Sequence, residues 1–418
     1  MKIAPSAHTP ETISPRPVGL LVTLTLVGWI ASMVWPVLLA KMGIYNYGTH
    51  YLDSYVVLAS LDAVRAGADP HAVNPLDPLL RNHVYSDWWL ALRWLGLTRA
   101  HNFLVGTAWV GAFALAAWTT ARPRNWGEAF WLTALLVSPP VLLAVNRANN
   151  DLVIFVLLAG CGMATTTAGC WRPLVAVVCL AFATGLKYFP APAVLAFLWV
   201  RPVRRMPGML LAALLAVALA LANVWAQIDR GRFVVDSGMH TMGASLWWRD
   251  LGWKDTESTL PGVLLLVAVA FILARSGVTT GLAKRGEPRE RLRAALGASV
   301  VLACFAVGVN FSYRWIFVLW PALWLWRQAW DGSLPNRQCW AVRAGCALVW
   351  LCLWLDGGLC LVINLLLHRS QAWVDHLLLV FRLWTQPLHW LLMMLLAGWL
   401  LEGALATIRE WWRECRDG

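Results

Sequence analysis

The chain has 418 residues, of which 59% are hydrophobic and only 13% are charged, and its mean hydropathy is +0.60. Soluble proteins usually carry a charged fraction of about 25%, so this composition excludes a soluble globular domain and favours a polytopic membrane protein. The formal net charge of +12 fits basic loops beside anionic lipid headgroups, and we predict no nucleic-acid partner.

The first long apolar run, 18–40, carries no charge and is long enough to cross a hydrocarbon core. The run is too long for the apolar core of a cleaved signal peptide, and the polar segment before it is too long as well. We therefore expect this segment to remain as a membrane anchor. Clusters of charge, proline and glycine delimit the other predicted spans: 103–120, 129–146, 152–169, 173–186, 188–200, 208–228, 260–276, 294–310, 314–327, 341–366 and 387–405.

These spans predict an all-α fold, a polytopic transmembrane bundle of roughly 10–13 helices. No linker or internal repeat divides the chain, so we expect one membrane domain over 1–418. Two longer loops, at about 41–102 and about 229–259, are predicted on the outer side. The many tryptophans near the predicted span ends are typical of a membrane-interface belt.

The stretch 173–200 allows one long helix or two short ones that meet at Lys187-Tyr188-Phe189-Pro190, because proline restricts the residue before it. We favour two helices. With that choice, 20 of the 34 Lys and Arg residues fall on the side of the N-terminus, in short basic loops. The positive-inside rule then predicts that both termini are cytoplasmic.

The first outer loop has helical periodicity at 51–65 and 86–100, which predicts two amphipathic helices at the interface. Asp53 lies where the first of them begins. It is either the N-cap of that helix or a functional acid facing a cavity, and the residue pattern alone leaves both open. Asp69 and Asp77 are predicted to be turn formers.

Further polar groups occupy the other predicted outer turns, where lipid makes them costly unless they face water or a ligand. Lys187 is either a snorkelling lysine or a phosphate ligand, and Asp151 is a possible helix cap. The candidate substrate-binding residues are Arg147 and Asn150 in 146–151, Lys187, His240 and Arg249 in 239–253, and Arg314 in 310–315.

The nine cysteines lie mostly inside predicted spans and have no Cys/His spacing typical of a metal site. We interpret them as small apolar fillers. We therefore predict no metal and no cofactor.

Four short motifs in this order resemble the GT-C superfamily of integral-membrane glycosyltransferases, most closely glycosyltransferase family 87, which uses polyprenyl-phosphate-mannose. The resemblance runs through most of the chain. The motifs are Asp53 followed by a helix and Gly67-x-Asp69-Pro70, Asn149-Asn150-Asp151-Leu152, Lys187-Tyr188-Phe189-Pro190, and Asn310-x-x-Tyr313-Arg314-x-Ile316.

The resemblance implies that Asp53 is the general base of an inverting transfer. The implied donor is a polyprenyl-phosphate-linked sugar, a hexose such as mannose, and the implied acceptor is a lipid or glycan of the cell envelope. It also implies a bacterial plasma membrane with the reaction on its periplasmic face. The cations Lys187, Arg147, Arg314 and Arg249 would stabilise the leaving phosphate.

Two other functions compete with this expectation. A polytopic transporter or lipid flippase would explain Asp356, which precedes Gly357-Gly358 in the middle of a predicted span. Two observations argue against a transporter or flippase: the other charges are predicted at the outer face, and the sequence has no inverted repeat. A non-catalytic scaffold for envelope assembly would tolerate loss of Asp53.

Overall fold

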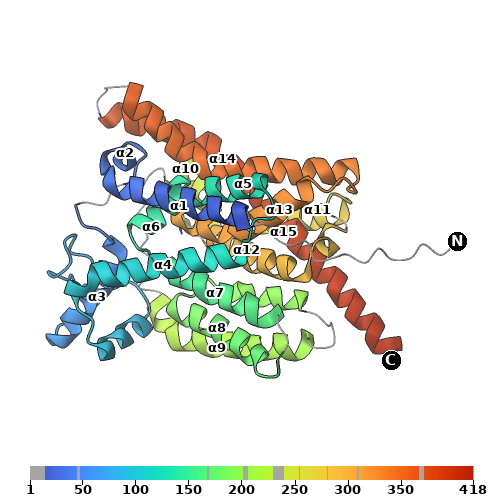
Figure 1. Ribbon diagram of the computed structural model, residues 1–418, viewed down its shortest axis with the longest axis horizontal. Helices are drawn as coiled ribbons and strands as arrows, with labels where there is room; N and C mark the ends of the chain where they lie inside the picture. Colours follow the sequence, from blue (N-terminus) through green and yellow to red (C-terminus); the bar gives the residue numbers. More distant parts are fainter. Residues whose placement is uncertain are drawn as a thin grey trace.

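The computed structural model describes residues 15–44, 48–166, 169–200, 206–228, 240–253, 255–279, 281–307, 310–366 and 371–417. The predicted loops that fall at 1–14, 201–205 and 229–239 lie outside these residues. The α-helices are α1 (Pro15–Val34), α2 (Pro36–Lys41), α3 (Leu52–Arg65), α4 (Asn102–Thr120), α5 (Trp126–Leu136), α6 (Pro139–Asn146), α7 (Asp151–Thr166), α8 (Arg172–Leu186), α9 (Met206–Ile228), α10 (Leu246–Asp250), α11 (Asp255–Arg275), α12 (Pro288–Ala306), α13 (Leu319–Ala329), α14 (Asn336–Leu366) and α15 (Gln371–Asp417) (Figure 1).

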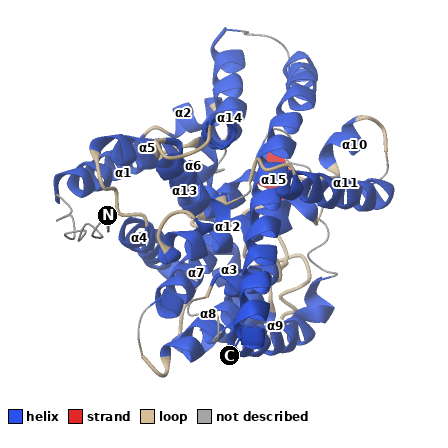
Figure 2. Cartoon of the chain, turned by 90° about the vertical axis from the view of Figure 1, so that its right-hand side faces the viewer, coloured by secondary structure: helices blue, strands red, loops and turns tan. Residues whose placement is uncertain are grey.

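Short 3₁₀ helices and one pair of strands complete the described chain. The 3₁₀ helices are η1 (Asp87–Leu95), η2 (Arg99–His101), η3 (Ala191–Trp199), η7 (Leu282–Lys284) and η8 (Ser312–Val318). Strands β1 (Thr241–Met242) and β2 (Asn310–Phe311) pair antiparallel, with Thr241 opposite Phe311 (Figure 2). The second outer loop is thereby attached to the turn that precedes η8.

The predicted polytopic helical bundle is confirmed. Among the described residues, five helices are long and apolar enough to cross a membrane, or six if α5 and α6, bent by 59° at Ser138, count as one span. Helices α7, α8 and α11 are apolar but shorter. Two predicted spans are partly 3₁₀: 188–200 contains η3, and 314–327 begins within η8.

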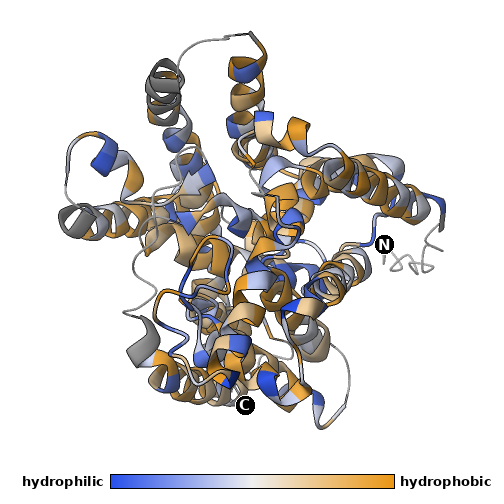
Figure 3. Cartoon of the chain, turned by 90° about the vertical axis from the view of Figure 1, so that its left-hand side faces the viewer, coloured by the Kyte–Doolittle hydropathy of each residue, from blue (hydrophilic) through white to orange (hydrophobic). Residues whose placement is uncertain are grey.

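Many of the helices carry apolar side chains on their outward surfaces. In the apolar windows of α1 and α9 only 28% of the residues are buried in the protein, and Leu215 and Leu219 of α9 are 59% and 73% exposed. Hydrophobic residues line most helices, whereas hydrophilic ones gather mainly in the loops (Figure 3). This is the surface that a bilayer would solvate.

The interior is built around α12, which packs against α7, α13, α15 and η3. Its neighbours contribute a stack of aromatic rings, in which Phe155 of α7 lies 4.3 Å from the Trp320 ring of α13. Five of the nine cysteines are buried and all nine are free thiols, as expected for filler residues.

The loop at about 41–102, predicted to be the first outer loop, packs onto the bundle. A helix is present at the predicted position 51–65, but ten of the 14 residues of α3 are buried, so it lies within protein more than on an interface. Gly106 of α4 leaves room for the Tyr51 ring, and Gly185 of α8 leaves room for the Trp88 ring; a Cβ atom at either glycine would collide with the phenol or the indole.

The predicted break within 173–200 is confirmed. Helix α8 ends at Leu186, and Lys187 has an extended backbone with φ −153° and ψ 134°. Pro190 then precedes η3. The side chain of Lys187 therefore lies at the end of a helix, as the two-helix interpretation requires.

The tryptophans near the predicted span ends differ in exposure. Trp89 and Trp315 are buried, and Trp89 donates from Nε1 to the Leu186 carbonyl at 3.2 Å, so these two belong to the core. Other tryptophans near predicted span ends are more than half exposed, among them Trp35, Trp94, Trp126, Trp171 and Trp412.

Candidate functional site

Asp53 lies in the first turn of α3 and is not its N-cap. The N-cap is Tyr51, which has the left-handed backbone conformation φ 56°, ψ 49°, uncommon outside glycine. The amide N–H groups of Tyr51 and Asp53 donate to the carbonyls of Asn146 and Arg147, at 3.1 and 2.9 Å. The start of α3 is thus docked on the end of α6, and the capping interpretation of Asp53 is wrong.

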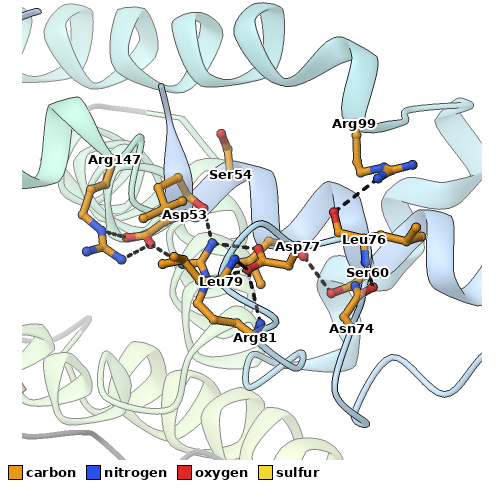
Figure 4. Close-up of polar contacts among 12 residues, drawn as sticks. Asp53, Ser54, Ser60, Asn74, Leu76, Asp77, Leu79, Arg81, Arg99 and Arg147 are labelled. Carbon is orange, nitrogen blue, oxygen red and sulfur yellow. Dashed lines mark hydrogen bonds and ion pairs between the residues drawn. The ribbon is translucent and has the colours of Figure 1, made fainter. Parts of the chain in front are cut away.

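The Asp53 carboxylate is buried and accepts hydrogen bonds at both oxygens (Figure 4). Arg147 donates from Nε to Oδ2 at 3.0 Å and from Nη2 to Oδ1 at 2.7 Å. Asn149 donates to Oδ2 at 2.6 Å, and Arg81 donates to Oδ1 at 3.3 Å. A carboxylate offers about four lone-pair positions, so these four hydrogen bonds occupy all of them.

Burial alone would raise the pKa of Asp53, but attraction and hydrogen bonding by Arg147, attraction by Arg81 and the Asn149 hydrogen bond outweigh it. The pKa of Asp53 therefore lies below its ordinary value. Asp53 is ionised at neutral pH.

Arg81 is held in turn by Asp77. It donates to Asp77 from Nε at 3.0 Å and from Nη2 at 2.8 Å, and Nη2 also donates to the Leu52 carbonyl at 2.7 Å. Asp77 also accepts the amide N–H groups of Leu79 and Arg81, which confirms its predicted turn role. Asp69 likewise accepts the amide of His71.

A second ionic group lies at the start of α7. Asp151 is fully buried, forms an ion pair with Lys187, and lies 3.6 Å from Nε of Arg314. Its amide N–H donates to the side-chain oxygen of Asn149 at 2.9 Å. Asn149 therefore performs the capping role expected of Asp151, and its amide group connects Asp53 to Asp151.

Two tyrosines, the partly buried Tyr85 and the buried Tyr313, lie beside these groups. Nζ of Lys187 is 5.3 Å from the ring centroid of Tyr85 and 5.9 Å from that of Tyr313. Burial, and next the negative charge of Asp53, raise the pKa of Tyr85 well above its ordinary value, so this phenol is neutral and can donate a hydrogen bond. Arg314 lies over the ring of Phe189, with 4.6 Å to its centroid.

The structure thus brings together Asp53, Arg147, Lys187 and Arg314 from four segments far apart in the sequence. We call the seven ionic residues of this region the outer cluster: Asp53, Asp77, Arg81, Arg147, Asp151, Lys187 and Arg314. Four cationic side chains face three carboxylates, so the formal net charge of the outer cluster is one positive charge.

The other predicted binding residues have different surroundings. Asn150 is buried, and among the described residues neither atom of its amide has a hydrogen-bond partner, whereas its neighbour Asn149 donates to Asp53. His240 donates from Nε2 to the Met42 carbonyl at 2.8 Å. Arg249 belongs to α10, which packs on α11 and α15 and is well separated from α3 (Figures 1 and 2).

Sequence reasoning missed Arg81 and Tyr85 as parts of the site, and it included Tyr313 in a motif without giving it a role. The spacing Asp77-x-x-x-Arg81 was the available signal for the first, since it suits an ion pair within one turn. Comparison of the chain with protein-family models, with curated proteins and with solved structures finds no match.

Proposed function

We propose that the protein is a membrane glycosyltransferase whose reaction takes place at the outer cluster. In this proposal a sugar, a hexose such as mannose, passes from a polyprenyl-phosphate donor to a lipid or glycan of the cell envelope with inversion. The outer cluster faces the periplasm of a bacterial plasma membrane, and both termini are cytoplasmic.

The observation that carries the proposal is the pairing of one buried carboxylate with a surplus of cations. A polyprenyl-phosphate sugar is a phosphodiester with one negative charge, which matches the single net positive charge of the outer cluster. Within the described residues, Asp151 is the one carboxylate that lies within ion-pair distance of Lys187 or Arg314. These two cationic side chains therefore have one positive charge in excess. This is the charge pattern that a leaving phosphate requires.

The chemistry assigns one step to each group. The acceptor hydroxyl oxygen attacks the anomeric carbon, the bond from that carbon to the phosphate oxygen breaks, and the phosphate leaves with the electron pair. The hydroxyl proton passes to Asp53, a step for which a positioned base contributes typically 10²–10⁴-fold. Lys187 and Arg314 stabilise the leaving phosphate.

Asp53 can accept that proton only if one of its four hydrogen bonds is released. The longest of them, at 3.3 Å, comes from Arg81, whose side chain also binds a second carboxylate, that of Asp77. We propose that the donor phosphate draws Arg81 away from Oδ1 of Asp53. Donor binding then exposes the base, which ties deprotonation of the acceptor to the presence of the sugar donor.

The test is sugar transfer by the purified protein in nanodiscs, with a radiolabelled polyprenyl-phosphate mannose and membrane lipid extract as the acceptor. Asp53→Glu keeps the charge but displaces the carboxylate, and we expect a loss of at least 10²-fold in turnover. Arg81→Gln should raise the apparent KM for the donor.

Asp62→Asn provides the matched control. Asp62 also lies on α3 and also accepts from two arginines, Arg65 at 3.2 Å and Arg99 at 3.0 Å, but outside the outer cluster. Turnover of Asp53→Glu equal to that of Asp62→Asn would remove Asp53 from the mechanism. Movement of the lipid-linked sugar across vesicles without transfer would favour the transporter or flippase alternative.

A further inference from the structure

A second polar region lies at the other end of α4. An open cavity of about 820 Å³ is bounded by the last turns of α4, the middle of α7 and the first turn of α12. Its polar wall contains five arginines and two glutamates: Arg122, Arg124, Arg289, Arg293, Arg327, Glu287 and Glu290.

Only part of this positive charge is neutralised. Arg124 pairs with Glu287 at 2.8 Å and with Glu290, and Arg327 pairs with Glu128 at 2.7 Å and with Glu290 at 2.6 Å. The other three arginines of the wall have no carboxylate within ion-pair distance among the described residues: Arg122, Arg289 and Arg293. These three guanidinium groups can bind an anion without breaking an ion pair.

Arg293 is built into the wall. Its Nη1 donates to the Thr120 carbonyl at 2.8 Å, whereas its Nε is buried with no hydrogen-bond partner in the part of the chain that the structure describes. The stem of Arg293 passes over Gly162 of α7, where an added Cβ would lie 3.2 Å from Cγ. The guanidinium is thus positioned at the end of α4, in the wall of the cavity.

The opposite wall of the cavity is apolar and faces outward. Leu115 of α4 is 63% exposed and Met163 of α7 is 42% exposed. Since both side chains are exposed at the edge of the cavity, acyl chains can reach it from the side. A soluble anion would make no favourable contact with this apolar wall.

Helix α4 fixes the distance between the two polar regions. At its start, Asn102 accepts a hydrogen bond from Ser54, the neighbour of Asp53, at 2.7 Å. At its end, Thr120 accepts from Arg293. Its 19 residues extend over about 28 Å, close to the roughly 30 Å of a hydrocarbon core. The cavity therefore lies at the membrane surface opposite to the outer cluster.

We infer that this cavity binds the phosphate headgroup of an anionic glycerophospholipid, with Arg122, Arg289 and Arg293 as its ligands. The phosphodiester accepts from the three guanidinium groups, and the acyl chains lie along α4 and α7. Basic pockets between transmembrane helices at a cytoplasmic surface are the setting in which such headgroups bind. The inference is independent of the reaction proposed for the outer cluster.

The test uses the full chain in detergent, titrated with phosphatidylglycerol, phosphatidylcholine or inorganic phosphate, with native mass spectrometry and the unfolding temperature as readouts. We expect phosphatidylglycerol to bind and stabilise, and the other two to have little effect. In the variant Arg122→Gln/Arg289→Gln/Arg293→Gln the apparent Kd for phosphatidylglycerol should rise by about tenfold or more.

Two comparisons make the result specific. The matched variant Arg275→Gln/Arg337→Gln/Arg413→Gln removes three exposed arginines outside the cavity and should bind as the parent does. Glu287→Gln, at an exposed residue that pairs with Arg124, leaves Arg124 paired with Glu290 but raises the net positive charge of the wall by one, and should tighten binding severalfold. The single variant Glu287→Gln still tests lipid binding at the cavity if the triple variant fails to fold.

Equal stabilisation by inorganic phosphate would assign the cavity to a soluble anion and overturn the inference. Equal binding of phosphatidylcholine would overturn it as well. The inference also fails if the triple variant binds phosphatidylglycerol as tightly as its matched control, or if Glu287→Gln leaves the affinity unchanged.

Discussion

Asp53 and Arg147 are joined through both main chain and side chain. The amide N–H of Asp53 donates to the Arg147 carbonyl at 2.9 Å, and the Arg147 guanidinium donates to both carboxylate oxygens. Arg147 caps the C-terminus of α6, while Asp53 lies in the first turn of α3. The carboxylate is therefore positioned by the turn between α6 and α7 as much as by its own helix.

Asp53→Asn should lower the free energy of unfolding by about 3 kcal/mol, because breaking a buried ion pair leaves the Arg147 guanidinium without its carboxylate, whereas Arg81 retains Asp77. Asp53→Glu keeps the charge and should cost less. Urea unfolding in detergent measures both. The control Asp62→Asn should cost about 1 kcal/mol or less; an equal cost for Asp53→Asn would show that the double guanidinium contact does not stabilise the fold.

The lowered pKa of Asp53 predicts a pH dependence with a definite sign. The group has the ordinary pKa of 3.8 when unfolded and a lower pKa when folded. Its contribution to stability is therefore fully present above pH 3.8 and is lost as the pH falls through the folded-state pKa. The unfolding temperatures of the parent and Asp53→Asn should converge in this acid range. A constant difference between them would contradict the shift.

Lys187 and Asp151 should behave as one unit. Lys187→Met leaves Asp151 buried with Arg314, 3.6 Å away, and should cost about 3–5 kcal/mol. Adding Asp151→Asn should recover part of this loss, with a coupling energy of about 2 kcal/mol in a double-mutant cycle. Additive losses would mean that the two charges do not stabilise each other.

The topology prediction can be tested with two exposed positions. Only Cys170 and Cys415 are exposed among the cysteines, so both are first changed to Ser. Val73→Cys, 71% exposed in the first outer loop, should react with an impermeant maleimide when only the outer membrane is opened. Gly332→Cys should react only after lysis. The reverse pattern would invert the orientation.

Uninterrupted apolar runs predicted most of the helices. Helices α11 and α15 continue through Pro261 and Pro387, whereas at other positions proline ends a helix. The break after Leu186 follows from Pro190 in this way. The site was predicted less completely, since Arg81 meets Asp53 only through the folded loop. Asn149 and Asn150 look alike in the sequence, yet one contacts Asp53 and the other does not. In a turn the side-chain direction changes from one residue to the next, and the hydrophobic periodicity of the sequence does not predict this direction.

The residues of the outer cluster lie at the ends of helices or in the turns between them: the start of α3, the end of α6, the start of α7, the end of α8 and η8. The middles of the long helices face lipid or one another and need only remain apolar and of suitable size. We expect distant relatives with the same activity to differ freely along these spans. They would be recognised by a few short polar signatures at fixed order, and overall percentage identity would be a poor measure of kinship for this kind of chain.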